Sequence, residues 1–72
     1  MKPILPKRQA EVFAAFQKLT KQFGGPPTAR EVGESCKPPI GRSNTWMYFT
    51  ILAKKGYLIK QEGRSQGGYR LP

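Results

Sequence analysis

Two double-proline breaks, Pro26-Pro27 and Pro38-Pro39, limit the length of any helix in this chain. Proline lacks a backbone N–H and clashes with the preceding helical turn, so a helix does not run through either pair. The chain has 72 residues, which is enough for one domain with a small core. We therefore expect a single domain over residues 1–72, built from short elements between the breaks.

Residues 7–23, before the first break, have the apolar spacing of an amphipathic helix. The apolar residues fall at i, i+1, i+4, i+7 and i+11, which places them on one face. They are Val12, Phe13, Phe16, Leu19 and Phe23. Gly24-Gly25 is expected to end this helix through a left-handed cap.

The segment from Thr28 to Glu31 has the pattern of a capping box, in which the threonine hydroxyl and the glutamate carboxylate each accept from a backbone N–H. It predicts a short second helix to about Cys36, with Gly33 allowing another helix to approach closely. Cys36 itself is expected to be a buried small hydrophobe.

A third helix is expected from a cap at Ser43 or Asn44 to Lys54 or Lys55, before Gly56. Its helical period predicts an inner and an outer face. The inner residues are Thr45, Phe49, Leu52 and Ala53, flanked by Trp46 and Tyr48, and the outer residues are Ser43, Met47, Thr50 and Lys54, with Ile51 also outward.

Two strands are expected after the third helix, over residues 57–61 and 68–71, joined by a glycine-rich hairpin tip over residues 63–68. The tyrosines Tyr48, Tyr57 and Tyr69 are expected to pack in the core or against the strands. The predicted fold class is therefore mainly α with a small β-hairpin, a three-helix winged helix-turn-helix.

The charge of the chain is extreme for its length, with 13 Lys and Arg against 4 Asp and Glu and a net charge of +9. Such a charge predicts a polyanionic partner.

The chain has no histidine and one cysteine, and its carboxylates form no obvious acid/base pair, so we expect no enzyme activity, small-molecule substrate, cofactor or metal. No apolar run approaches the ~18 residues that span a bilayer, and we expect a cytoplasmic protein without a membrane partner.

In a helix-turn-helix the later helix enters the major groove with its amino end foremost. Arginine can contact guanine or phosphate, asparagine can contact adenine, and exposed apolar groups can contact the thymine methyl. The candidate DNA-binding residues are Thr28 and Arg30 at the second helix, Arg42, Ser43, Asn44, Trp46, Met47, Lys54 and Lys55 on the third, and Arg64, Ser65 and Gln66 at the hairpin tip.

Five segments together resemble the N-terminal DNA-binding domain of the LexA repressor, in the same order and over about residues 5–71. They are Arg8 to Phe13, Gly25 to Val32, Arg42 to Asn44, Leu52 to Gly56 and Gly63 to Leu71. The resemblance implies a bacterial or phage-encoded, nucleoid-associated transcription regulator. Its third helix would contact the operator and its wing the DNA backbone.

The chain departs from the LexA pattern in ways that change the expected target. Trp46 and Met47 stand where that repressor carries acidic base-reading residues, one residue is inserted around 37–41, and the wing has an extra glycine at 67–68. The usual SOS operator is therefore not expected. The chain ends at Pro72, so the family's second domain, with its dimerisation and Ser/Lys self-cleavage, is not carried over.

The main hypothesis is a sequence-specific regulator of transcription that binds double-stranded DNA, such as a small repressor. One such module buries only ~600–1,000 Å² of its surface on DNA, so we expect a second copy on a palindromic site, or a partner protein, to be needed. With ~6 phosphate contacts its affinity should fall ~10³-fold between 50 and 200 mM salt.

Two other functions are open from the sequence. The first is a winged-helix protein-interaction module that binds a regulatory or replication partner through an apolar stripe of Trp46, Met47, Tyr48 and Ile51. The second is binding to RNA or to a membrane surface, although the apolar face of the first helix is needed for the core and no RNA-specific motif is present.

Overall fold

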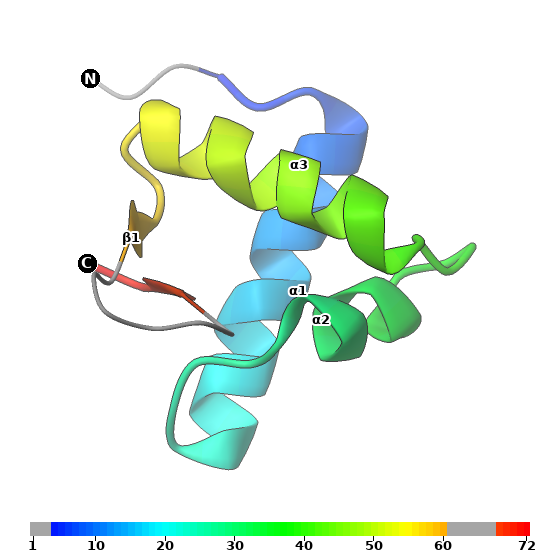
Figure 1. Ribbon diagram of the computed structural model, residues 1–72, viewed down its shortest axis with the longest axis horizontal. Coiled ribbons are helices and arrows are strands. Elements are labelled where there is room, and N and C mark those ends of the chain that lie inside the picture. Colours follow the sequence, from blue (N-terminus) through cyan, green and yellow to red (C-terminus); the bar gives the residue numbers. More distant parts are fainter. Residues whose placement is uncertain (1–3, 61–67) are drawn as a thin grey trace.

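The computed structural model describes residues 4–60 and 68–72. In these residues the chain forms three α-helices and a two-stranded antiparallel sheet (Figure 1). The elements are α1 (Lys7–Phe23), α2 (Ala29–Ser35), α3 (Arg42–Lys54), β1 (Ile59–Lys60) and β2 (Tyr69–Arg70). This arrangement confirms the predicted fold class, and none of the described helices is long and apolar enough to cross a membrane.

The predicted end of α1 and start of α2 are confirmed. Gly24 has φ 73°, in the left-handed region, and its N–H donates to the Thr20 carbonyl at 3.0 Å. At α2 the Glu31 N–H donates to the Thr28 hydroxyl at 3.1 Å, and the Thr28 N–H donates to the Glu31 carboxylate at 2.8 Å. The capping box is therefore complete, and it fixes the direction in which α2 leaves the proline segment.

The predicted N-cap of α3 is wrong by two or three residues. Gly41 is the N-cap, so Ser43 and Asn44 lie in the first turn and do not cap the helix. The reason lies with Thr45, which is fully buried and whose hydroxyl and backbone N–H both donate to the Gly41 carbonyl at 2.9 Å. Burial of that threonine fixes the first turn around Gly41.

The core lies where α3 crosses α1, with α2 and β2 at its sides (Figure 1). Edge-to-face contacts join Phe49 to Phe16 at 5.2 Å and to Tyr69 at 5.7 Å between ring centroids, so α1, α3 and β2 share one aromatic cluster. The buried apolar residues are Val12, Ala15, Phe16, Leu19, Ala29, Val32, Cys36, Ile40, Phe49, Leu52, Leu58 and Tyr69. As predicted, Cys36 is a small core residue, and burial raises the pKa of its thiol.

Three expectations from periodicity are corrected by the structure. Phe23 is 52% exposed, because it lies at the end of α1 farthest from α3 (Figure 1). Ile51 is half-buried instead of outward. Strand β1 begins at Ile59, which pairs with Arg70, and not at Tyr57, and β2 covers Tyr69–Arg70 instead of residues 68–71, while the predicted end of the first strand at Gln61 lies outside the described residues. Tyr48 and Tyr57 pack against the core as expected.

Gly33 on α2 lies tightly against Ile40 and Thr45, in keeping with the predicted close approach at this glycine. Its carbonyl accepts from the Ile40 N–H at 2.9 Å. A Cβ at this position would lie 2.7 Å from the Thr45 hydroxyl oxygen and closer still to the Ile40 carbonyl oxygen. The absence of a side chain at Gly33 therefore sets the spacing between α2 and α3.

Candidate nucleic-acid interface

The amino end of α3 is open to solvent, as the DNA-binding hypothesis requires. Arg42, Ser43 and Asn44 are all exposed. No chain segment within residues 4–60 and 68–72 covers them, so a guanidinium, a hydroxyl and an amide stand together at the end of a helix. Those groups can contact phosphates or base edges.

The outer face of α3 continues from this end through Met47, Thr50 and Lys54. These residues and Ser43 follow one another at intervals of three or four, which is one stripe of a helix, and all are exposed. The Thr50 hydroxyl donates to the Trp46 carbonyl at 3.1 Å and lies 3.4 Å from the Tyr69 hydroxyl on β2. The hairpin therefore borders the exposed face of α3.

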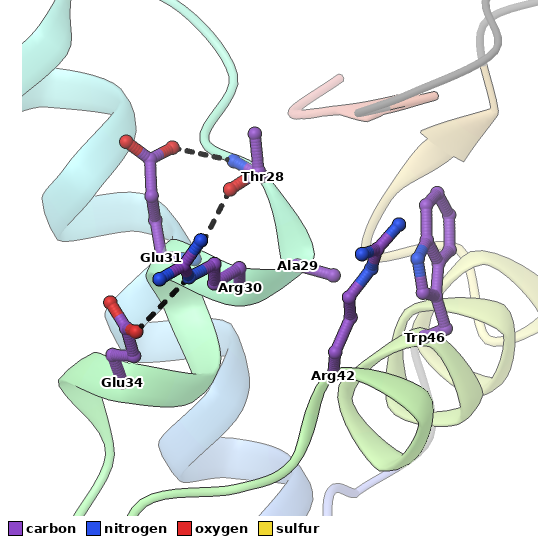
Figure 2. A pocket seen from close by; sticks show the side chains of 7 residues that line it. All are labelled: Thr28, Ala29, Arg30, Glu31, Glu34, Arg42 and Trp46. Carbon is purple, nitrogen blue, oxygen red and sulfur yellow. Dashed lines mark hydrogen bonds and ion pairs between the residues drawn. The ribbon is translucent and has the colours of Figure 1, made fainter.

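A groove of about 520 Å³ separates the start of α2 from the start of α3. Figure 2 shows the Arg42 side chain extending along this groove beside the ring of Trp46, opposite Arg30 and the capping box. The lining residues are Thr28, Ala29, Arg30, Glu31, Glu34, Arg42 and Trp46. The groove brings together four of the predicted DNA-binding residues, along with two carboxylates.

Two of those four residues, Thr28 and Arg30, already have partners within the protein. The Thr28 hydroxyl accepts the capping bond described above, so its structural role is at the helix start. Arg30 forms an ion pair with Glu34 at 3.3 Å, with side chains 77% and 65% exposed. A pair this exposed is worth at most ~1 kcal/mol, so it leaves Arg30 free to turn to a stronger anion.

Trp46 packs at the edge of the core. Its ring centroid lies 5.8 Å from Phe49 and 5.6 Å from Tyr69, and the residue is half-buried. This contact holds the hairpin against α3 and leaves one part of the ring facing the groove (Figure 2). A direct contact of Trp46 with DNA stays a prediction.

The two lysines at the end of α3 differ in their surroundings. Lys54 is exposed on the outer stripe, whereas the Lys55 ammonium donates to the Gln9 side chain on α1 at 2.8 Å. Lys54 is thus the better placed of the two for a phosphate.

The hairpin carries the exposed cations Lys60 and Arg70, which were not among the predicted site residues. Arg64, Ser65 and Gln66 lie outside the described residues.

A polar cluster fixes the turn that leads into α3. Arg8 on α1 forms an ion pair with Glu11 and donates to the Pro38 carbonyl at 2.7 Å. The Glu11 carboxylate accepts from the Lys37 N–H at 3.0 Å. These long-range bonds hold the turn against α1 and thereby position the amino end of α3.

The cluster makes stability depend on pH in a defined direction. The Lys37 N–H and the Arg8 guanidinium lower the pKa of Glu11 from its ordinary value of 4.5. The ionised carboxylate therefore stabilises the fold above about pH 4.5, and this contribution is lost as pH falls through the lowered folded pKa. We expect Glu11→Gln to lower the melting temperature at pH 7, and the gap to wild type to narrow at pH 3.

Circular dichroism melts at the two pH values check this prediction. Glu34→Gln is the matched control, because it removes a carboxylate from an exposed pair and should change the melting temperature only slightly. A gap between Glu11→Gln and wild type that stays the same at pH 3 would show that the carboxylate charge does not hold the turn.

The apolar stripe suggested for protein binding does not form one exposed surface. Met47 is 51% exposed, but Trp46, Tyr48 and Ile51 are half-buried. Trp46 and Tyr48 lie on opposite flanks of the helix, as their spacing of two residues requires.

Thr50 lies on the exposed stripe of α3 but was not among the predicted site residues. Its spacing from Met47 and Lys54 would have placed it on the same face.

A scan of protein-family models gave no match to this chain, and neither did a search of curated proteins. The resemblance to the LexA domain therefore stays a prediction from the quoted segments.

Proposed function

We propose that this chain is a LexA-like module that binds double-stranded DNA sequence-specifically and regulates transcription, with α3 in the major groove and the hairpin on the DNA backbone. The observation that carries the proposal is the outer face of α3, which is exposed along its length from Ser43 to Lys54 and has the exposed Arg42 beside its amino end. A helix with this exposure fits the width of the major groove.

The charge and the fold support the same assignment. A net charge of +9 on 72 residues favours a polyanion, and a helix-turn-helix followed by a hairpin offers two elements to one duplex. Glu31 and Glu34 line the groove between α2 and α3 and not the outer stripe of α3. The acidic groups therefore lie to one side of the surface that we assign to DNA.

The direct test is selection of binding sites from random duplex DNA by the purified chain, followed by titration of the selected duplex at several salt concentrations. We expect an enriched motif and a binding constant whose logarithm falls linearly with the logarithm of the salt concentration. An inverted repeat in the motif would indicate two copies per site. Absence of any enriched motif, with equal binding to all duplexes, would contradict sequence-specific regulation.

Lys54 provides a prediction for a single phosphate contact. We expect Lys54→Gln to weaken binding to all duplexes similarly and to reduce the salt slope by about one, because one fewer counterion is released. Lys18→Gln is the matched control, since Lys18 is an exposed helical lysine on α1. Equal effects of both variants would show that only the total charge matters and would exclude a defined contact from α3.

A further inference from the structure

The middle of the exposed face of α3 lacks the groups that usually distinguish bases by hydrogen bonding. Residues 45–53 contain no charged side chain and no amide. The hydroxyl of Thr50, which is exposed there, already donates to the Trp46 carbonyl. Met47, 51% exposed, is the largest apolar side chain on this face. The centre of α3 therefore offers mainly methyl and thioether surface.

The charged groups of α3 lie at its two ends. Arg42 and Lys54 are 12 residues apart, which at 1.5 Å per residue separates their backbones by about 18 Å. The major groove is about 12 Å wide, so side chains at the ends of α3 can reach the phosphates of both strands. In that placement, Met47 and Thr50 lie over the floor of the groove. This complementarity of charge favours a duplex as the occupant of the face.

An apolar surface over the groove floor distinguishes the four bases in one main way. Thymine carries a 5-methyl group in the major groove, whereas cytosine and the purines have none. Contact with that methyl group removes apolar surface of both the protein and the base from water, which is favourable. A contact of this kind needs no hydrogen-bonding group from the protein, in keeping with the composition of residues 45–53.

We propose that Met47, supported by Thr50, is a specificity-determining contact of α3 and selects thymine through its 5-methyl group. This inference rests on the proposed function, because it names the base chemistry that the same surface recognises. Arg42 and Lys54 then supply phosphate contacts at the two ends, and the centre of the helix supplies a preference for thymine.

Deoxyuridine provides a direct test, because it differs from thymidine by the 5-methyl group alone. Each thymine of the selected duplex is replaced in turn, and the dissociation constant is measured at one salt concentration. We expect a loss of about fourfold at one or two thymines, which corresponds to ~0.8 kcal/mol for one buried methyl-sized group. Elsewhere the replacement should have no effect.

Variants at Met47 test whether the effect of removing the thymine methyl group arises from contact with this residue. Met47→Ala should bind the thymine and deoxyuridine duplexes equally, whereas Met47→Leu should retain the preference because it keeps an apolar side chain of similar size. The exposure of Met47 lets both variants fold, which circular dichroism would verify. An unchanged salt slope in Met47→Ala would place its effect at the base and not at a phosphate.

The outcomes separate the two proposals. Salt-dependent binding that is insensitive to deoxyuridine at every position, or a preference for thymine that persists in Met47→Ala, would overturn the thymine contact and leave the DNA-binding proposal in place. Absence of binding to any duplex, at every salt concentration, would overturn both.

Discussion

Replacement of Phe49 by alanine is expected to remove about 3–5 kcal/mol from the free energy of unfolding. Phe49 is fully buried, and its ring touches Phe16 on α1, Trp46 on α3 and Tyr69 on β2. Its truncation would leave a cavity between these elements. A domain of this size has only about 4–11 kcal/mol of stability in total, so the variant should lose a large part of its resistance to urea.

Urea denaturation followed by circular dichroism measures this loss, and another phenylalanine provides a matched control. Phe23→Ala removes the same atoms from a side chain that is 52% exposed, and should change the free energy of unfolding by no more than about 0.5 kcal/mol. Phe49→Leu should cost less than Phe49→Ala because it keeps most of the volume. Equal costs at positions 23 and 49 would contradict the described core.

The helices could be predicted from the sequence because their signals are local. The double prolines, Gly24 and the capping box of Thr28 and Glu31 each act within a few residues, and the bounds of α1 and the start of α2 agree with them. Periodicity also predicted the outer stripe of α3. These signals involve neighbouring residues whose geometry is the same in any fold.

The errors arose where tertiary contacts decide the local structure. The apolar period of α1 includes Phe23, but the other helices do not reach the end of α1 where Phe23 lies, so its side chain is exposed. The period of one helix cannot show how far its neighbours extend. The cap of α3 is fixed by burial of Thr45 and not by the capping preferences of Ser43 and Asn44. Pairing between Ile59 and Arg70 limits the strands, which alternation alone cannot show.

The sequence predicted which charged residues belong to the candidate site, but not which of them form hydrogen bonds or ion pairs within the protein. Exposure of Lys54 followed from the helical period, whereas Arg42 was expected in the turn before the helix and is the first residue of α3. The bond from Lys55 to Gln9 joins residues 46 apart in the chain, and the bonds from Arg8 and Glu11 to the turn before α3 join residues 30 and 26 apart. No local pattern contains such pairs, so sequence reasoning could not separate the free cations from the engaged ones.

Gly33→Ala should have the second large effect, because the position of α3 depends on the missing side chain. The added Cβ would overlap the Ile40 carbonyl and the Thr45 hydroxyl, and the carbonyl belongs to the backbone, which cannot turn aside as a flexible side chain does. We expect a cost of about 1–3 kcal/mol, typical of overpacking. Gly25→Ala is the matched control, since nothing lies within 4 Å of its added Cβ.

The same substitution tests whether the spacing of α2 and α3 matters for binding. Relief of the overlap must move α2 away from the turn before α3, and the movement would change the angle at which α3 meets a duplex. We expect Gly33→Ala to weaken binding to the selected duplex more than to random DNA, at a temperature where calorimetry shows it folded. The reason is that phosphate contacts tolerate a small tilt of α3 better than base contacts do. Equal weakening on both duplexes would therefore mean that the spacing of α2 and α3 matters for the fold but not for sequence-specific binding.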